Sequence, residues 1–142
     1  MKIPDKMHTT NYFDTFIEVA EDTKVASAQI PEEKNGKKTI ASMQFDMLSK
    51  KPYKYTSDDV LFQVYADRND LTKEEYEEAR AQFFSKGQAC FRASPLTKQF
   101  GFGVHFDKKG KMALYEMESK EYQQFLKDAN VKKVKAMRSA KK

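Results

Sequence analysis

The sequence predicts a single α+β domain in which helices pack against a mostly antiparallel sheet. Its 142 residues are the usual length of one domain, and 39% hydrophobic residues, with eleven Phe and seven Tyr, can fill a core. Stretches with the period of strands alternate with stretches with the period of helices. Three β segments follow one another between residues 88 and 118, which favours antiparallel pairing. We expect the domain at residues 11–139, between a loose lead-in at 1–10 and a basic end at 140–142.

The first half of this domain is predicted to contain two strands and one helix. Residues 13–20 alternate in polarity, which is typical of a strand with one core face. The polar run at 32–38 indicates a loop. Residues 39–49 fit both periods, but their Met, Leu, Gln and Ala favour a helix, which Pro52 would end. Residues 60–66 are apolar on both faces, which is typical of a central strand covered on both sides.

The second half is predicted to contain two helices and three strands. Thr72 can cap a helix at 72–85, and Glu75 completes its capping box. Ser119 can cap a last helix at 119–128. The expected strands lie between these helices, at 88–93, 100–107 and 111–118. The predicted order of elements is therefore β-α-β-α-β-β-β-α.

A tight turn at residues 107–111 predicts a hairpin between the last two strands. Its register would pair His105 with Ala113 and Gly103 with Tyr115. His105 would then lie on a face that is uncrowded, because glycines at neighbouring positions have no side chain. Glycine inside a strand marks the close approach of a ligand or of another protein group. Packing of Tyr115 over Gly103 is the favoured explanation. The other face would send the following side chains into the core: Phe102, Val104, Phe106, Met112 and Leu114.

The net charge of +5 is concentrated at the C-terminal end. Residues 127–142 hold seven cations and one acid, so they carry +6 and the remaining chain carries −1. A basic segment of this kind can bind nucleic acid, anionic lipid or an acidic protein. A solvated end that aids solubility is the alternative that the composition favours, because mobile termini are common.

Cysteine content and hydropathy argue against a disulfide-bonded, secreted or membrane-spanning protein. Cys90 is the only cysteine, which excludes an internal disulfide and a zinc site built from several cysteines of one chain. The first residues lack the apolar run of a signal peptide, and no stretch approaches the length of a membrane span. We therefore expect a cytoplasmic protein, with no metal site and no cofactor suggested by the sequence.

An anion site is one interpretation of the turn at Ser94 and Pro95. Ser94 suits a helix cap and Pro95 suits the first helical position, and the free N–H groups of a helix start bind anions. Lys86, Arg92 and Lys98 would add positive charge. An ordinary capped turn with solvated cations is the alternative, and it is favoured because such a turn needs no ligand.

Catalytic interpretations rest on few residues. Cys90 and His105 could form a thiolate pair if they meet in space, but the sequence offers no third group to orient them. Ser94 and Lys98 lack the spacing of Ser/Lys enzymes. The adjacent carboxylates at 58–59 would point to opposite faces of a strand, so they make a poor acid–base pair.

Several stretches resemble a known family. They are NYFDTFIEVAEDT, PYKYTSDDVLFQVYADR, FFSKGQACFRASPLTKQFGFGVHFDKKGKMALYEMESKEY and VKAMRS, and they are similar to a family of small microbial proteins that is a domain of unknown function. The resemblance implies relatives with Trp at the position of Phe102 and Pro at that of Ala89, which weakens any claim that either residue is indispensable. The resemblance implies no activity and no catalytic set. It implies one domain that includes the VKAMRS end, so residues 131–139 are expected to be more than a solvated tail.

Together these features favour a non-enzymatic binding domain for an anionic ligand or nucleic acid. The expected contacts come from Lys86, Arg92, Ser94, Lys98, His105, Tyr115 and the C-terminal cations. A small enzyme that uses His105 as acid or base, with Cys90, Arg92 or Tyr115 nearby, is the alternative. A protein-interaction module with exposed Phe and Tyr is a third. The first two hypotheses require these side chains to gather around one hollow.

Overall fold

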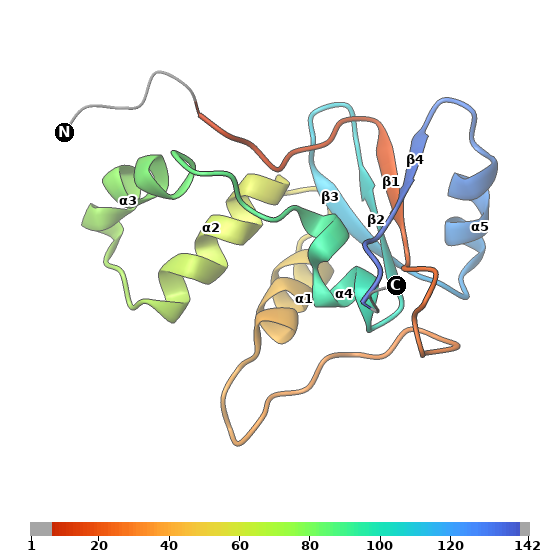
Figure 1. Cartoon of the computed structure of the whole chain (residues 1–142), viewed down its shortest axis with the longest axis horizontal. Helices are drawn as coiled ribbons and strands as arrows, with labels where there is room; N and C mark the ends of the chain where they lie inside the picture. Colours follow the sequence, from red (N-terminus) through yellow and green to blue (C-terminus); the bar gives the residue numbers. More distant parts are fainter. Residues whose placement is uncertain (1–6, 140–142) are drawn as a thin grey trace.

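The computed structural model describes residues 7–139 and contains a four-stranded sheet with helices on both faces (Figure 1). The strand order is β3-β2-β1-β4. Strands β1 (Thr15–Glu18) and β2 (Phe102–Phe106) are antiparallel, and so are β2 and β3 (Met112–Glu116), whereas β4 (Lys132–Lys135) runs parallel to β1. The predicted α+β class is confirmed. Part of the expected lead-in and the basic end at 140–142 lie outside the described residues.

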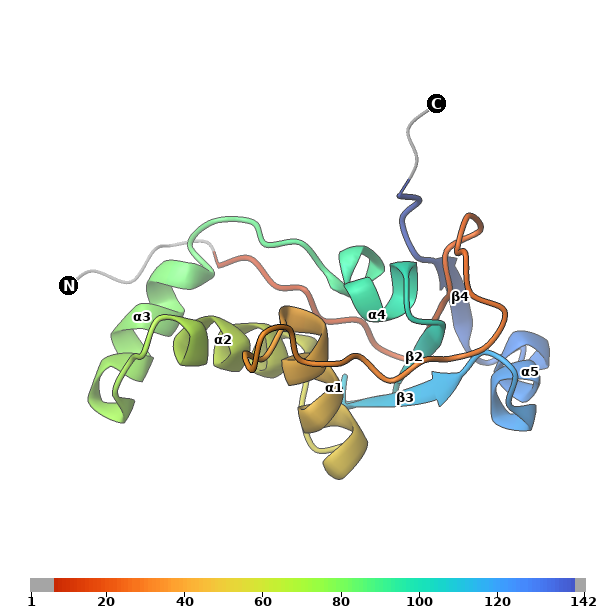
Figure 2. The same cartoon turned by 90° about the horizontal axis from the view of Figure 1, so that it is seen from below.

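The two faces of the sheet belong to separate cores. One face packs against α1 (Ile40–Lys50) and α4 (Pro95–Lys98), and the other packs against α5 (Lys120–Lys127) (Figures 1 and 2). Ile17 lies in the first core and Phe16 in the second, because neighbouring residues of a strand point to opposite faces. The predicted first strand therefore exists, but both of its faces are buried rather than one.

The segment predicted as a strand at 60–66 is helix α2 (Ser57–Arg68), so that prediction is wrong. Thr56 caps the helix and Asp59 completes a capping box, which sets the helical start locally. The helix is apolar on several sides because it packs between neighbours: Val60 and Val64 join the main core, whereas Phe62 joins a third cluster. A helix that is buried on several sides lacks a one-sided apolar stripe, and this makes it resemble a buried strand in sequence.

Residues 73–83 contain the helix predicted after Thr72. It begins as a 3₁₀ turn at Lys73–Glu75 and continues as α3 (Tyr76–Phe83), with the expected Thr72–Glu75 capping box. Together α2 and α3 form an arm that extends away from the sheet at the opposite end of the molecule from α5 (Figure 1). The predicted helices at 39–49 and 119–128 are confirmed as α1 and α5.

No strand forms at residues 88–93, so the strand predicted there is wrong. This segment instead leads into a 3₁₀ turn at Phe91–Ala93, which is followed by α4. The N–H group of Ala93 donates to the carbonyl of Cys90, and that of Ser94 donates to the carbonyl of Phe91. These local bonds satisfy the backbone without a neighbouring strand.

The basic C-terminal segment contains strand β4, which the sequence did not predict. Val131 and Ala136 are buried on either side of β4, so residues 131–136 belong to the fold. Lysines at three of its four positions hide the pattern of a strand. β4 is an edge strand, and lysine on such an edge discourages pairing with other chains.

The predicted hairpin register is confirmed. Gly103 lies opposite Tyr115, and His105 lies opposite Ala113. The face with Phe102, Val104 and Phe106 enters the main core as expected, and the face with Gly103 and His105 turns toward α5. None of the helices within residues 7–139 has the length and apolar character that crossing a membrane requires.

Candidate functional site

The residues expected to form one site lie in three separate regions. His105 and Tyr115 lie on the sheet face beside α5, where both rings contact Phe125. Arg92, Ser94 and Lys98 belong to the 3₁₀ turn and to α4, on the other side of the sheet. Lys86 follows α3 and lines a cavity in the α2–α3 arm. The expected common hollow does not form.

Ser94 is part of the interior. It is 5% exposed, its hydroxyl oxygen accepts from the N–H group of Leu96 at 3.1 Å, and the hydroxyl donates to Gln44 at 2.6 Å. The start of α4 is therefore capped by protein, and the helix has only four residues. The capped turn, rather than an anion site at a helix start, describes this position.

Arg92 holds the C-terminal segment in place. Its Nε donates to the carbonyl of Lys135 at 2.6 Å, and its own carbonyl accepts from the N–H group of Met137 at 2.7 Å. These two bonds join the 3₁₀ turn to the chain that leaves β4. Arg92 thus positions residues 135–137, and its side chain is committed to protein contacts.

Lys98 lines a cavity of about 580 Å³, which we call the α4 cavity. Its lining comes from three distant parts of the chain: Asp22, Lys24, Lys98, Gln99 and Ser139. The N–H group of Ser139 donates to Asp22 at 2.9 Å, and nearby Glu21 pairs with Lys135 at 2.9 Å. Within residues 7–139 no ion pair joins Lys24 or Lys98 to a carboxylate.

His105 and Tyr115 meet through a third side chain, Tyr53. The Tyr53 hydroxyl lies 2.8 Å from Nδ1 of His105 and 2.7 Å from the Tyr115 hydroxyl. The imidazole also stacks on Phe125, with ring centres 4.3 Å apart. We call Tyr53, His105 and Tyr115 the tyrosine–histidine cluster.

Tyr53 reaches this cluster from a strained backbone position. Its φ is +59°, in the left-handed region that bulky residues rarely adopt. Its N–H group donates to the carbonyl of Met112 at 2.7 Å, which ties the residue to β3. Strain of this kind costs about 1–3 kcal/mol and persists only where surrounding contacts hold it.

Burial favours the neutral forms of His105 and Tyr53 through their pKa values. Burial lowers the pKa of His105, against the opposing effect of Asp107 and other carboxylates. Burial raises the pKa of Tyr53, and its hydrogen bond with Tyr115 adds to this effect. A neutral imidazole held by a phenol can accept a proton. The α4 cavity and the cavity beside Lys86 are lined by other side chains.

Cys90 does not meet His105, so the thiolate pair considered from the sequence does not form. Its Sγ lies 3.4 Å from the Tyr12 hydroxyl, and the Tyr12 ring packs on Phe106 of the main core. Burial raises the pKa of Tyr12 to about 12, and the bond with Cys90 contributes. The sheet separates this pair from His105, which faces α5.

The other two residue pairs considered for catalysis, Asp58 with Asp59 and Ser94 with Lys98, do not form acid–base pairs; Asp58, Asp59 and Ser94 make structural contacts. Asp58 accepts from Thr9 and Thr10 at 2.7 Å, and so fastens the start of the described chain to α2. Asp59 caps α2 and pairs with Arg80 at 3.0 Å. The Ser94 hydroxyl bonds Gln44 rather than Lys98.

Sequence reasoning missed Tyr53 and the residues beside it. Residues 52–56 read PYKYT and were only a connection after the expected helix. The only feature of the sequence that could have indicated a role is that Tyr53 and Tyr55 flank Lys54. They gain a role because the connection runs along β3, where the N–H group of Met112 donates to the carbonyl of Tyr55.

Comparison with known proteins identifies a family but no activity. No curated protein and no solved structure matches the chain. A family model described as a family of unknown function (DUF6157) matches residues 7–142. The matched region covers the sheet, all helices and the C-terminal segment. The chain therefore belongs to this family of unknown function.

Proposed function

We propose that this domain binds an anionic, phosphate-bearing ligand at the α4 cavity. The observation that carries the proposal is that Lys24 and Lys98 line the same cavity and that neither is paired with a carboxylate among residues 7–139. Two ammonium groups at one hollow attract an anion, and a phosphate offers several acceptor oxygens to both. Ser139 also lines the cavity.

The surroundings support a net positive potential. Lys135 is held by Glu21, and this contact raises the pKa of Lys135, so that acid is already compensated. Asp22 accepts from the backbone of Ser139. Arg138 is exposed next to Ser139. In this proposal Arg92 acts indirectly, because it holds the C-terminal segment that forms one wall.

Calorimetric titration with two probes tests the proposal. Pyrophosphate and a short single-stranded thymidine oligonucleotide are titrated into the full chain at low and moderate salt. We expect Lys24→Met and Lys98→Met each to weaken binding by about fivefold and to reduce the salt slope by about one. Lys73→Met is the matched control, since Lys73 lies in the α2–α3 arm, away from the cavity.

The two probes also separate the kinds of ligand. Tighter binding of pyrophosphate indicates a small anion, and tighter binding of the oligonucleotide at equal phosphate concentration indicates nucleic acid. An affinity that does not change with salt concentration contradicts the proposal, because it would show that the attraction is not ionic. An equal loss of affinity in the Lys73→Met control also contradicts it, because it would locate the attraction outside the cavity.

A second function is favoured by the tyrosine–histidine cluster. The strained Tyr53 positions a neutral imidazole, which is the arrangement a general base needs. Hydrolysis of p-nitrophenyl acetate should then fall in His105→Gln and remain unchanged in His8→Gln. Equal rates in wild type and His105→Gln would remove the enzymatic candidate.

A further inference from the structure

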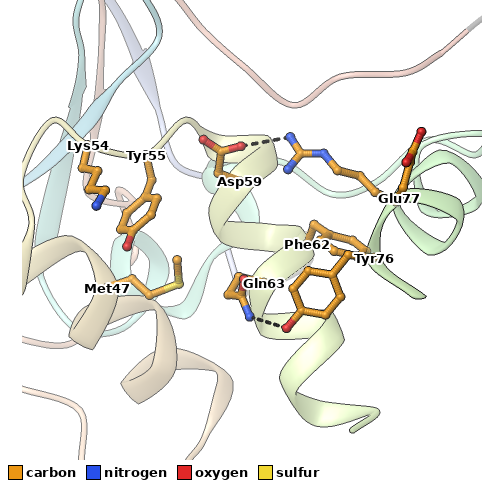
Figure 3. A pocket seen from close by; sticks show the side chains of 9 residues that line it. Met47, Lys54, Tyr55, Asp59, Phe62, Gln63, Tyr76 and Glu77 are labelled. Atoms are coloured by element: carbon orange, nitrogen blue, oxygen red, sulfur yellow. Dashed lines mark hydrogen bonds and ion pairs between the residues drawn. The ribbon is translucent and has the colours of Figure 1, made fainter. Parts of the chain in front are cut away.

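Another cavity, which neither proposed site uses and which differs from the cavity beside Lys86, lies between α1, α2 and α3 (Figure 3). Its volume is about 430 Å³, which suits a small organic molecule. We call it the arm cavity. Met47 and Phe62 give it an apolar surface, and Tyr55, Gln63 and Tyr76 contribute polar atoms. An apolar cavity with a few polar groups is the usual form of a small-molecule site.

Hydrogen bonds already fix the α2–α3 wall of this cavity. Gln63 donates to the Tyr76 hydroxyl at 3.1 Å, and Arg80 donates to Asp59 at 3.0 Å (Figure 3). The Arg80 guanidinium also lies over the Phe62 ring, 5.9 Å from its centre. Because these contacts join the helices without a ligand, binding would require little reorganisation of the wall.

Positive charge is concentrated at one side of the arm cavity. Lys54 lines it on the side opposite Glu77 (Figure 3). Contact with Lys51 lowers the pKa of Lys54, and the Lys111 ammonium donates to the Lys54 carbonyl at 3.2 Å. Within residues 7–139 none of these lysines is in an ion pair.

The other charged residues of the lining are Asp59, Arg80 and Glu77. Arg80 is neutralised by Asp59, and hydrogen bonds together with this partner lower the pKa of Asp59 despite its partial burial. Among the described residues, the charged lining residues without an ion pair are therefore Lys54 on one side and Glu77 on the opposite side. A negative group is favoured beside the Lys54 ammonium and away from Glu77.

We propose that the arm cavity binds a small planar aromatic acid, with its ring on Met47 and Phe62 and its carboxylate at Lys54. The methionine sulfur and the aromatic walls favour a flat ring. The Lys54 ammonium favours a carboxylate. The site is distinct from the α4 cavity, with which it shares no lining residue.

NMR titration with benzoate tests this inference, with acetate and benzamide as probes that carry only the charge or only the ring. We expect saturable amide shifts at the arm cavity and tighter binding of benzoate than of either partial probe. Lys54→Met should weaken benzoate binding by about fivefold, because it removes a charged but solvent-exposed partner. Gln63→Glu, which places a carboxylate in the lining, should weaken it at least as much.

Two control variants separate this site from general attraction. Lys109→Met removes an exposed lysine of the β2–β3 turn, and Lys98→Met alters only the α4 cavity. Both should leave benzoate binding unchanged. Benzoate that binds no tighter than acetate, or an equal loss in Lys54→Met and Lys109→Met, would overturn the inference. So would unchanged affinity in both cavity variants.

Discussion

Replacement of Gly103 by alanine tests whether the sheet and α5 are closely packed. A Cβ atom at this position would lie 2.5 Å from the Phe16 ring and 2.6 Å from the Tyr122 ring. Phe16 is fully buried, and the Tyr122 hydroxyl accepts from the N–H group of Val19 at 2.9 Å. Neither ring can move freely, so the added methyl group must displace α5 or distort β2.

The expected destabilisation is about 2 kcal/mol, the middle of the range for overpacking in a core. For a chain of 142 residues the unfolding entropy is about 0.3 kcal/mol per kelvin, so this loss lowers Tm by roughly 7 °C. Phe16 also stacks on Phe125, with ring centres 5.0 Å apart, and the His105 ring stacks on Phe125 as well. The substitution should therefore also shift the NMR signals of the His105 ring.

Thermal and urea unfolding followed by far-ultraviolet circular dichroism measure this effect. Gly87→Ala is the matched control, because the nearest atom to its Cβ would be 3.9 Å away, and it should stay within about 0.5 kcal/mol of wild type. A Gly103→Ala protein as stable as wild type would show that the space over Gly103 is open. The ligand explanation of this glycine would then regain support over packing.

Three further predictions concern a cap, a clamp and a titration. Asp59→Ala should destabilise the protein by about 1–2 kcal/mol in urea unfolding, because it removes the capping box of α2 and the partner of Arg80, and an unchanged midpoint would contradict this. Arg92→Met should cost about 1 kcal/mol and speed amide hydrogen exchange in β4, whereas the control Lys86→Met should not; equal exchange would show that the bond to Lys135 is unimportant. Because burial lowers the pKa of His105 below its ordinary 6.5, the unfolded chain binds the proton more readily. The contribution of His105 to the free energy of unfolding should be fully present above about pH 6.5 and be lost as the pH falls through the folded-state pKa. His105→Gln should flatten this pH dependence in unfolding experiments at pH 5 to 7.5.

Elements that depend on neighbours in the chain could be predicted from sequence. The β2–β3 register follows from one tight turn, and the starts of α3 and α5 follow from Thr72 and Ser119. Alternation along a strand also placed His105 and Tyr115 on one face. These features are set by bonds that close within a few residues, so their signal is present in short windows of sequence.

The candidate sites required contacts between distant residues. Tyr53 joins His105 across 52 positions, and the α4 cavity combines residues near 22, 98 and 139. No local pattern reports such distances. The expected common hollow fails for the same reason. The sequence predicts a strand at residues 88–93, whereas the chain forms a 3₁₀ turn at Phe91–Ala93 and then α4, on the other side of the sheet from His105.

Composition and local hydrogen bonding are therefore sufficient to specify the α+β class, the three predicted helices and the hairpin of this protein. Tertiary packing selects the rest. It makes 57–68 a helix, because α1 and α3 bury opposite sides of it, and it makes 132–135 a strand, because β1 supplies its partner. Burial by distant partners overrides the weak propensity of such short segments, and it alone sets which side chains face the cavities.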